Sequence, residues 1–143
     1  MFKRIALLLF LLSCVAPPLF AADEQTKEPE SQEKPNADYQ YFLLEPDIIT
    51  NYSSSGKSMG YIRVTVELLV KSKLDFKLLE KHEPLIRDKI IEVLSSQQAD
   101  VIKSTGQREN IRKQCINGIN TVLEREVGAK PVEKLIFTKF LYQ

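Results

Sequence analysis

The chain has 143 residues with 20 basic and 19 acidic side chains, which gives it a formal net charge of only +1. Setting apart the two basic residues at the N-terminus and the net charge of −4 in residues 23–38 leaves about +3 for residues 39–143. A charge this small and scattered argues against binding to nucleic acid. The last 105 residues are enough for one small domain with its own core. They contain a single cysteine, Cys115, so no intramolecular disulfide can hold that core together.

The N-terminus has the layout of a secretory signal peptide. Lys3 and Arg4 precede an apolar run over residues 5–15, and the small residues Ala21 and Ala22 follow. A helix of these 11 apolar residues would be about 16 Å long, well short of the hydrocarbon core of about 30 Å that a membrane span must cross. We therefore expect a signal peptide over residues 1–21, cleaved between Ala21 and Ala22.

Two other outcomes for this segment remain open. The stretch ending at Cys14, with Leu11, Leu12 and Ser13 before it, resembles a bacterial lipoprotein box in which Cys14 would carry lipid and become the new N-terminus. Alternatively, the segment is retained uncleaved as an anchor. All three outcomes deliver the rest of the chain to the far side of the inner membrane.

Residues 22–38 predict a disordered acidic linker. From residue 23 onward this stretch contains no large apolar side chain, and it carries Pro29 and Pro35. Sixteen such residues would typically separate their ends by about 20–24 Å. A domain tethered in this way to a membrane-attached N-terminus would stay near the membrane surface.

The domain begins with two predicted strands. Residues 39–52 are extended but interrupted at Pro46, which suits an edge strand or a bend. Residues 53–58 predict a turn and lack the features of a phosphate-binding loop. The next strand has the clearest alternation in the chain, and its predicted buried face comprises Ile62, Val64, Val66, Leu68 and Val70.

Two helices and a final strand follow. The first helix begins or kinks at Pro84, and its apolar stripe comprises Leu79, Ile86, Ile90, Val93 and Leu94. Ser104 and Gln107 predict a capping box opening the second helix, whose stripe comprises Ile111, Cys115, Ile119, Val122 and Leu123. Gly128 suits a left-handed C-terminal cap. The last strand runs from residue 132 to 142, with Ile136, Phe140 and Tyr142 on its apolar face.

The predicted fold is therefore α+β. A small antiparallel sheet, in the order strand-strand-helix-helix-strand, is covered on one face by two helices. The domain occupies residues 39–143.

The side chains that could carry chemistry do not form a catalytic set. His82 is the only histidine, lacks partners at metal-ligand spacing, and is interpreted as a helix-boundary residue. Cys115 lies on an apolar stripe and is interpreted as an inert core thiol. Asp88 and Glu92 are one helical turn apart among basic neighbours, which favours a solvated helix face. We predict no enzyme activity, no cofactor and no metal.

Arg108, Arg112 and Lys113 form a basic group on the second helix. A solvated face is the interpretation favoured here, and a contact for an acidic partner is the alternative. No partner-binding residue is assigned by number.

Three segments in order carry a family resemblance: residues 41–46, residues 83–97 and the closing strand 135–143. Together they resemble the flagellar basal-body-associated protein FliL family over residues 39–143. That resemblance implies a periplasmic domain similar to the stomatin/prohibitin core, which tends to assemble into rings. It also implies association with the flagellar stator and the basal-body membrane ring, with effects on motility and, in some members, on switching during chemotaxis. Family members typically carry a full transmembrane helix where this chain has a short, signal-peptide-like segment.

Two functional hypotheses follow. The first is a non-enzymatic basal-body-associated protein, at the periplasmic side of the inner membrane, that supports the motor by homo-oligomerisation and contacts with stator or basal-body proteins. The second is a soluble periplasmic binding or chaperone-like module without a motor role, whose exposed strand edge near Pro46 would accept another strand.

Overall fold

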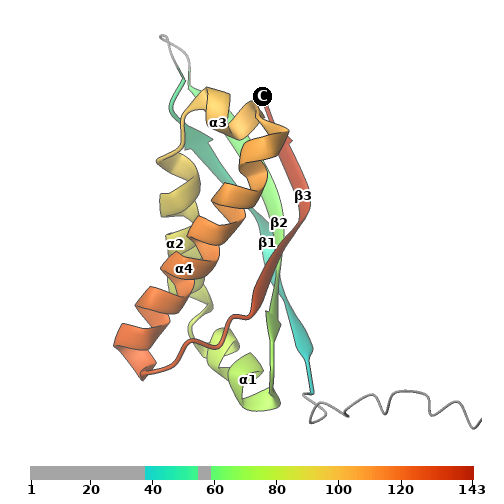
Figure 1. Cartoon of the computed structure of the whole chain (residues 1–143), viewed down its shortest axis with the longest axis vertical. Helices are drawn as coiled ribbons and strands as arrows, with labels where there is room; N and C mark the ends of the chain where they lie inside the picture. Colours follow the sequence, from blue (N-terminus) through green and yellow to red (C-terminus); the bar gives the residue numbers. More distant parts are fainter. Residues whose placement is uncertain (1–37, 55–58) are drawn as a thin grey trace, which may run out of the picture. The chain divides into compact units, whose positions relative to one another are not determined.

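The computed structural model describes residues 38–54 and 59–143. Three antiparallel strands form one sheet in the order β1-β2-β3: β1 spans Gln40–Tyr52, β2 spans Gly60–Val70 and β3 spans Lys134–Tyr142 (Figure 1). The expected signal peptide, nearly all of the expected linker, and residues 55–58 of the predicted turn lie outside the described residues.

The helices lie between β2 and β3 in the chain and cover one face of the sheet (Figure 1). Their bounds are α1 Lys73–Lys81, α2 Glu83–Ser95, α3 Ala99–Lys103 and α4 Arg108–Val127, with a 3₁₀ turn at Thr105–Gln107. α2 packs against β1 and α4, and α4 also packs against β3. The predicted α+β fold with a one-sided antiparallel sheet is confirmed, while the likeness to the stomatin/prohibitin core stays a prediction. No helix among the described residues has the length and apolarity that crossing a membrane requires.

The predicted core positions are confirmed almost throughout. All five alternating residues of β2 are buried. Their side chains point to the same face of the sheet, and the helices cover that face. The five predicted stripe residues of α4 are buried as well. On α1 and α2, Leu79, Ile86, Ile90 and Leu94 are buried and Val93 is partly buried.

The first helix is divided, because His82 separates α1 from α2. Its backbone N–H donates to the carbonyls of Leu78 and Leu79 at 3.1 and 3.2 Å and closes α1. Pro84 then lies in the first turn of α2, where its missing N–H breaks no helical hydrogen bond. The prediction that a helix begins near Pro84 is confirmed, and the single helix expected from the apolar stripe is in fact two.

The capping box predicted at Ser104 and Gln107 is wrong. Neither side chain makes a capping hydrogen bond, because a 3₁₀ turn at Thr105–Gln107 intervenes and α4 begins only at Arg108. The C-terminal cap is confirmed: Gly128 has φ of +73°, and its N–H donates to the Glu124 carbonyl at 2.9 Å.

The face predicted for the final strand is also partly wrong. Thr65 pairs with Lys139 and Val66 pairs with Phe137, so β3 carries one extra residue at this point. This bulge interrupts the alternation, and both Phe137 and Phe140 pack on the core with ring centres 5.2 Å apart. As a result, Ile136 pairs with Glu67 on the opposite face instead of joining Phe140. Tyr142, predicted to be buried, is 41% exposed at the end of an edge strand.

Candidate functional site

The face of the sheet that carries no helix is the candidate functional surface, and we call it the outer face. It is formed by the strand residues that alternate with the buried ones. Toward the end of the sheet where β3 finishes, the register places Ile49, Arg63 and Leu141 side by side across the three strands. Thr65 and Lys139 form the next pair along β2 and β3.

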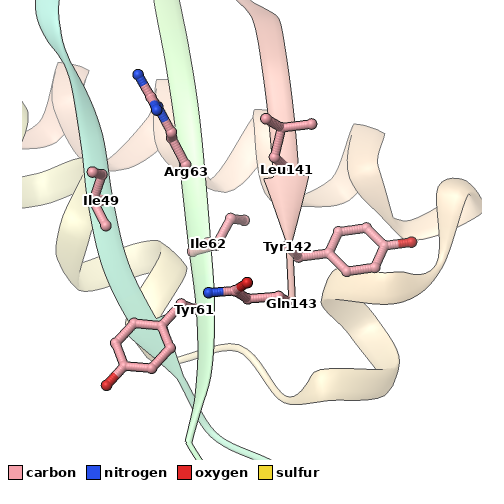
Figure 2. A pocket seen from close by; sticks show the side chains of 7 residues that line it. All are labelled: Ile49, Tyr61, Ile62, Arg63, Leu141, Tyr142 and Gln143. Carbon is pink, nitrogen blue, oxygen red and sulfur yellow. The ribbon is translucent and has the colours of Figure 1, made fainter.

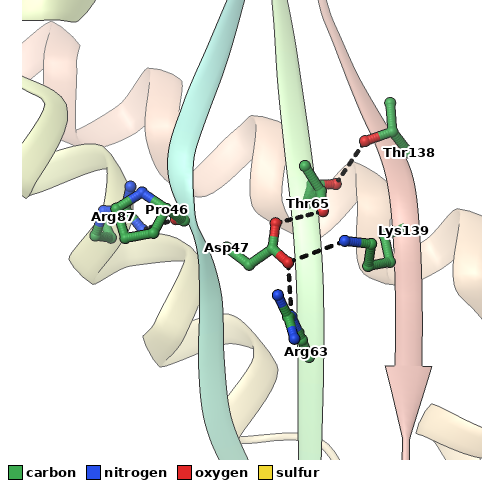
Figure 3. Close-up of polar contacts among 7 residues, drawn as sticks. All are labelled: Pro46, Asp47, Arg63, Thr65, Arg87, Thr138 and Lys139. Atoms are coloured by element: carbon green, nitrogen blue, oxygen red, sulfur yellow. Dashed lines mark hydrogen bonds and ion pairs between the residues drawn. The ribbon is translucent and has the colours of Figure 1, made fainter.

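A bulge in β1 shapes the middle of this face. Leu44 pairs with Val66 and Ile48 pairs with Val64, so three β1 residues, 45–47, lie opposite the single β2 residue Thr65. Pro46 lies within this bulge, consistent with proline being confined to edges and irregular positions of sheets. The Arg87 guanidinium of α2 donates to the Pro46 carbonyl at 2.7 Å (Figure 3). The edge strand predicted at Pro46 is confirmed, because β1 lies at one edge of the sheet. The contact with Arg87 of α2 holds its bulge in place.

Asp47 follows the proline and has three hydrogen-bond partners from the two other strands of the sheet (Figure 3). Its carboxylate accepts hydrogen bonds from Thr65 Oγ1 at 2.5 Å, Arg63 Nε at 2.6 Å and Lys139 Nζ at 3.1 Å. These four residues are called the Asp47 network below. Because β1, β2 and β3 each contribute at least one member, the network ties all three strands together on the outer face.

The electrostatics of the Asp47 network favour a permanently charged anchor over a proton-transfer site. The hydrogen bond from Thr65, followed by those from Arg63 and Lys139, holds the pKa of Asp47 far below its usual range. A general acid or base needs a pKa near the working pH, which these contacts prevent. The network can therefore orient charge for a contacting protein, and it is unsuited to acid–base catalysis.

An outer apolar cluster lies next to the network and consists of Ile49, Tyr61 and Leu141 (Figure 2). These side chains are 64%, 51% and 57% exposed, and they line a shallow depression of about 280 Å³. Large apolar side chains grouped on an exposed surface beside polar residues are typical of protein interaction sites. Farther along the same face, Tyr41 and Leu43 of β1 are also exposed.

Two interpretations made from single residues are confirmed. His82 lies at the α1–α2 boundary and is partly buried, as expected for a helix-boundary histidine. Cys115 is fully buried, and burial raises the pKa of its thiol to about 12, so the thiolate does not form at neutral pH.

The predicted solvated carboxylate face on α2 is also confirmed. Asp88 and Glu92 are both exposed, and Lys89 of the same helix forms an ion pair with Glu92. Within residues 38–54 and 59–143, no three His, Cys, Asp or Glu side chains come together as metal ligands would.

The solvated face favoured for the basic group on α4 is wrong for two of its three members. Arg108 and Arg112 are partly buried and lie toward β3, because the guanidinium of Arg108 stacks on Phe140 and that of Arg112 donates to the Leu135 carbonyl. Lys113 is exposed, as expected. The remaining predicted sites, Cys14 and the Ala21–Ala22 junction, lie outside the described residues.

Sequence reasoning missed both the Asp47 network and the outer apolar cluster. One signal was available, since Tyr61 occupies a position that the alternation assigns to the wet face of β2. The grouping itself depends on strand register, which places Ile49 and Leu141 on either side of Arg63 although they are far apart in sequence.

Comparison with known proteins agrees with the resemblance noted in the sequence. The family model for the flagellar basal body-associated protein FliL matches residues 41–143. The flagellar protein FliL of Aquifex aeolicus (strain VF5) is 32% identical over 102 residues, which are 71% of this chain and 60% of that protein. The chain thus spans about three-fifths of the length of this curated relative. On these matches, the chain belongs to the FliL family of flagellar basal-body-associated proteins.

Proposed function

We propose that this protein supports the flagellar motor from the periplasmic side of the inner membrane, as a non-enzymatic member of the basal body. In this role it assembles with further copies of itself and contacts stator or membrane-ring proteins. Its effects extend from torque and stator function to rotational switching in chemotaxis. Membership of the FliL family is the observation that carries this proposal.

The outer face is the surface that we assign to assembly with further copies. The helices cover the opposite face, so an apolar cluster on the uncovered side is available for contact (Figure 1). The Asp47 network beside it supplies a rigid set of charges, which would fix the orientation of a neighbour more than the strength of its binding.

Deletion of the gene and complementation with surface variants test this function. Loss of the protein is expected to reduce swimming or swarming under high load and to leave growth unchanged. Ile49→Glu and Leu141→Glu place charges within the outer apolar cluster and are expected to restore motility poorly. Leu74→Glu is the matched control, because Leu74 is 80% exposed on α1, away from the outer face.

Three results would count against the proposal. Normal motility of the deletion strain under load would remove the motor role. Full complementation by both outer-face variants, at wild-type protein levels, would remove the outer face from that role. A tagged protein spread evenly through the periplasm, without foci at motors, would favour the binding or chaperone-like module.

We also propose export by an N-terminal signal peptide, residues 1–21, followed by an acidic linker over residues 22–38. Intact mass and membrane fractionation of the protein from its native host, compared with Cys14→Ser, distinguish the outcomes. A mass beginning at Ala22 would establish cleavage. A lipidated Cys14, lost together with membrane association on substitution, would establish a lipid anchor, and an intact Met1 in the membrane fraction would establish a retained segment.

A further inference from the structure

A second surface lies at the edge of the sheet that β3 forms. There a groove separates α4 from β3. The groove has a volume of about 440 Å³. Arg108, Glu109 and Arg112 of α4 form one wall, and the four successive residues 134–137 of β3 form the other. Because four consecutive strand residues line it, the groove follows the direction of β3 and has the form of a channel for an extended chain.

The groove has an excess of positive charge. Its one carboxylate, Glu109, already accepts hydrogen bonds from both Nε and Nη2 of Arg112, and Arg112 lowers the pKa of this carboxyl group. Lys134 and Arg108 are the remaining charged side chains of the lining. The guanidinium carbon of Arg108 lies 4.7 Å from the centre of the Phe140 ring, which holds the side chain in place.

Arg108 also has a donor without an acceptor. Its Nε is buried, and no hydrogen-bond partner for it exists within the part of the chain that the structure describes. A buried guanidinium N–H usually has a partner, because burying the group without a hydrogen bond is unfavourable. A carboxylate would complement the excess positive charge of the groove, and Arg108 has no acceptor at its buried Nε within the described residues that would hold its guanidinium away from such a ligand.

The free edge of β3 adds a row of backbone groups. Tyr61 and Gln143 exchange both backbone hydrogen bonds, at 3.1 and 3.0 Å, so Gln143 faces β2. The alternation of an antiparallel ladder then directs the backbone groups of Phe140 and Tyr142 away from β2. The Leu135 carbonyl also faces this side, where it accepts only a long contact of 3.4 Å from Arg112. Within residues 38–54 and 59–143, β2 is the only strand that pairs with β3.

We propose that this groove binds an extended acidic peptide of a partner protein, which adds as a fourth strand beside β3. Its backbone pairs with the free edge, and one carboxylate side chain reaches Arg108. Side chains two positions apart in a strand face the same way, so the neighbouring apolar side chain of the peptide packs on Phe137. A small anion would use the guanidinium alone, and it would leave the strand edge and the aromatic wall empty. The inference does not depend on the motor role or on the outer apolar cluster, since no residue of that cluster lines the groove.

Binding of a defined peptide to the purified full chain tests the proposal. The probe is a fluorescein-labelled, threonine-rich peptide of seven residues, with a glutamate and a valine two positions apart. We expect saturable binding that weakens about tenfold or more for Arg108→Gln, since a hydrogen bond to a charged group contributes about 1.5–3 kcal/mol. Arg125→Gln is the matched control, because Arg125 is an exposed arginine on the same helix that does not line the groove.

The peptide itself provides two further controls that leave the protein unchanged. Replacement of its glutamate by lysine is expected to abolish binding. N-methylation of alternate backbone amides is expected to do the same, because the methylated edge cannot pair with β3. Equal binding of the glutamate and lysine peptides, unchanged binding after methylation, or equal effects of the two arginine variants would overturn the proposal. Full displacement of the peptide by millimolar inorganic phosphate would also overturn it, since the groove would then be a simple anion site.

Discussion

Asn120 of α4 holds the connection between the last helix and the last strand, and its removal is the sharpest test of the fold. Its side-chain amide donates to the Val132 carbonyl at 2.8 Å, and its carbonyl oxygen accepts from the Val132 N–H at 3.1 Å. Val132 is buried, and the next residue, Glu133, donates from its backbone to the Leu69 carbonyl of β2 at 2.9 Å. The two amide contacts thus determine where β3 begins to pair.

We expect Asn120→Ala to destabilise the domain by about 2 kcal/mol. Each neutral hydrogen bond contributes about 1 kcal/mol, and the buried backbone groups of Val132 lose their partner. For a domain near 100 residues, this corresponds to a melting temperature lower by about 8 °C or more. With a urea m-value of about 2 kcal/mol/M, the unfolding midpoint would fall by about 1 M.

Asn117→Ala is the matched control for this measurement. Asn117 is exposed on the same helix, and both substitutions gain the same small helix propensity of alanine over asparagine. The difference between the two urea midpoints therefore isolates the contacts with Val132. Equal stabilities of the two variants would refute the reasoning.

Three further predictions concern the core and the titrating groups. Gly60→Ala should destabilise the domain by about 1–3 kcal/mol, because the new Cβ would lie 2.2 Å from Cζ of the buried Tyr52; Gly106→Ala, with its nearest atom at 3.8 Å, should have little effect in the same thermal unfolding assay. The lowered pKa of Asp47 stabilises the fold above the ordinary carboxyl pKa, so stability should fall from about pH 4 downward, and urea titrations showing the same acid dependence for Asp47→Asn would contradict this. The raised pKa of Cys115 disfavours its thiolate in the folded state, so stability should fall as the pH rises from about 9 toward 12; Cys115→Ala should lack that fall, and parallel alkaline profiles would contradict the account.

The outer apolar cluster and the α4–β3 groove have different consequences for partners. The cluster presents exposed apolar side chains next to fixed charges, which suits a broad protein contact. The groove presents a strand edge with an excess of positive charge, which suits one extended acidic segment. Because the two sites share no residue, Ile49→Glu and Arg108→Gln should separate assembly from peptide binding.

Periodicity in the sequence was enough to predict most of the core. The five alternating residues of β2 and the apolar stripe of α4 repeat at spacings of about two and 3.6 residues, and each spacing corresponds to one buried face of one element. Gly128 was predictable for a similar local reason, since the αL conformation beyond a helix strongly favours glycine. Three ordered segments also pointed to the FliL family, which the matches over residues 41–143 confirm.

Errors arose where one element depends on another. The bulge that separates Ile136 from Phe140 arises in the pairing of β3 with β2, and no pattern within β3 alone reveals an extra residue. The 3₁₀ turn before α4 replaced a capping box that the local sequence favoured. From the sequence, Arg108 and Arg112 appeared to be surface charges on an amphipathic helix. They form one wall of a groove only because α4 packs beside β3.

The local repeat of apolar side chains along one strand or helix was enough to predict most of the buried residues, because burial of a regular element follows its own period. Which exposed residues lie together could be learned only from the tertiary structure. Their grouping depends on the strand register and on how the helices pack against the sheet. Asp47, Arg63 and Lys139 come from three strands, and they meet only through the bulge at Pro46 and the pairing on either side of β2. The groove likewise requires α4 to lie along a free edge, an arrangement that no single segment of this chain encodes.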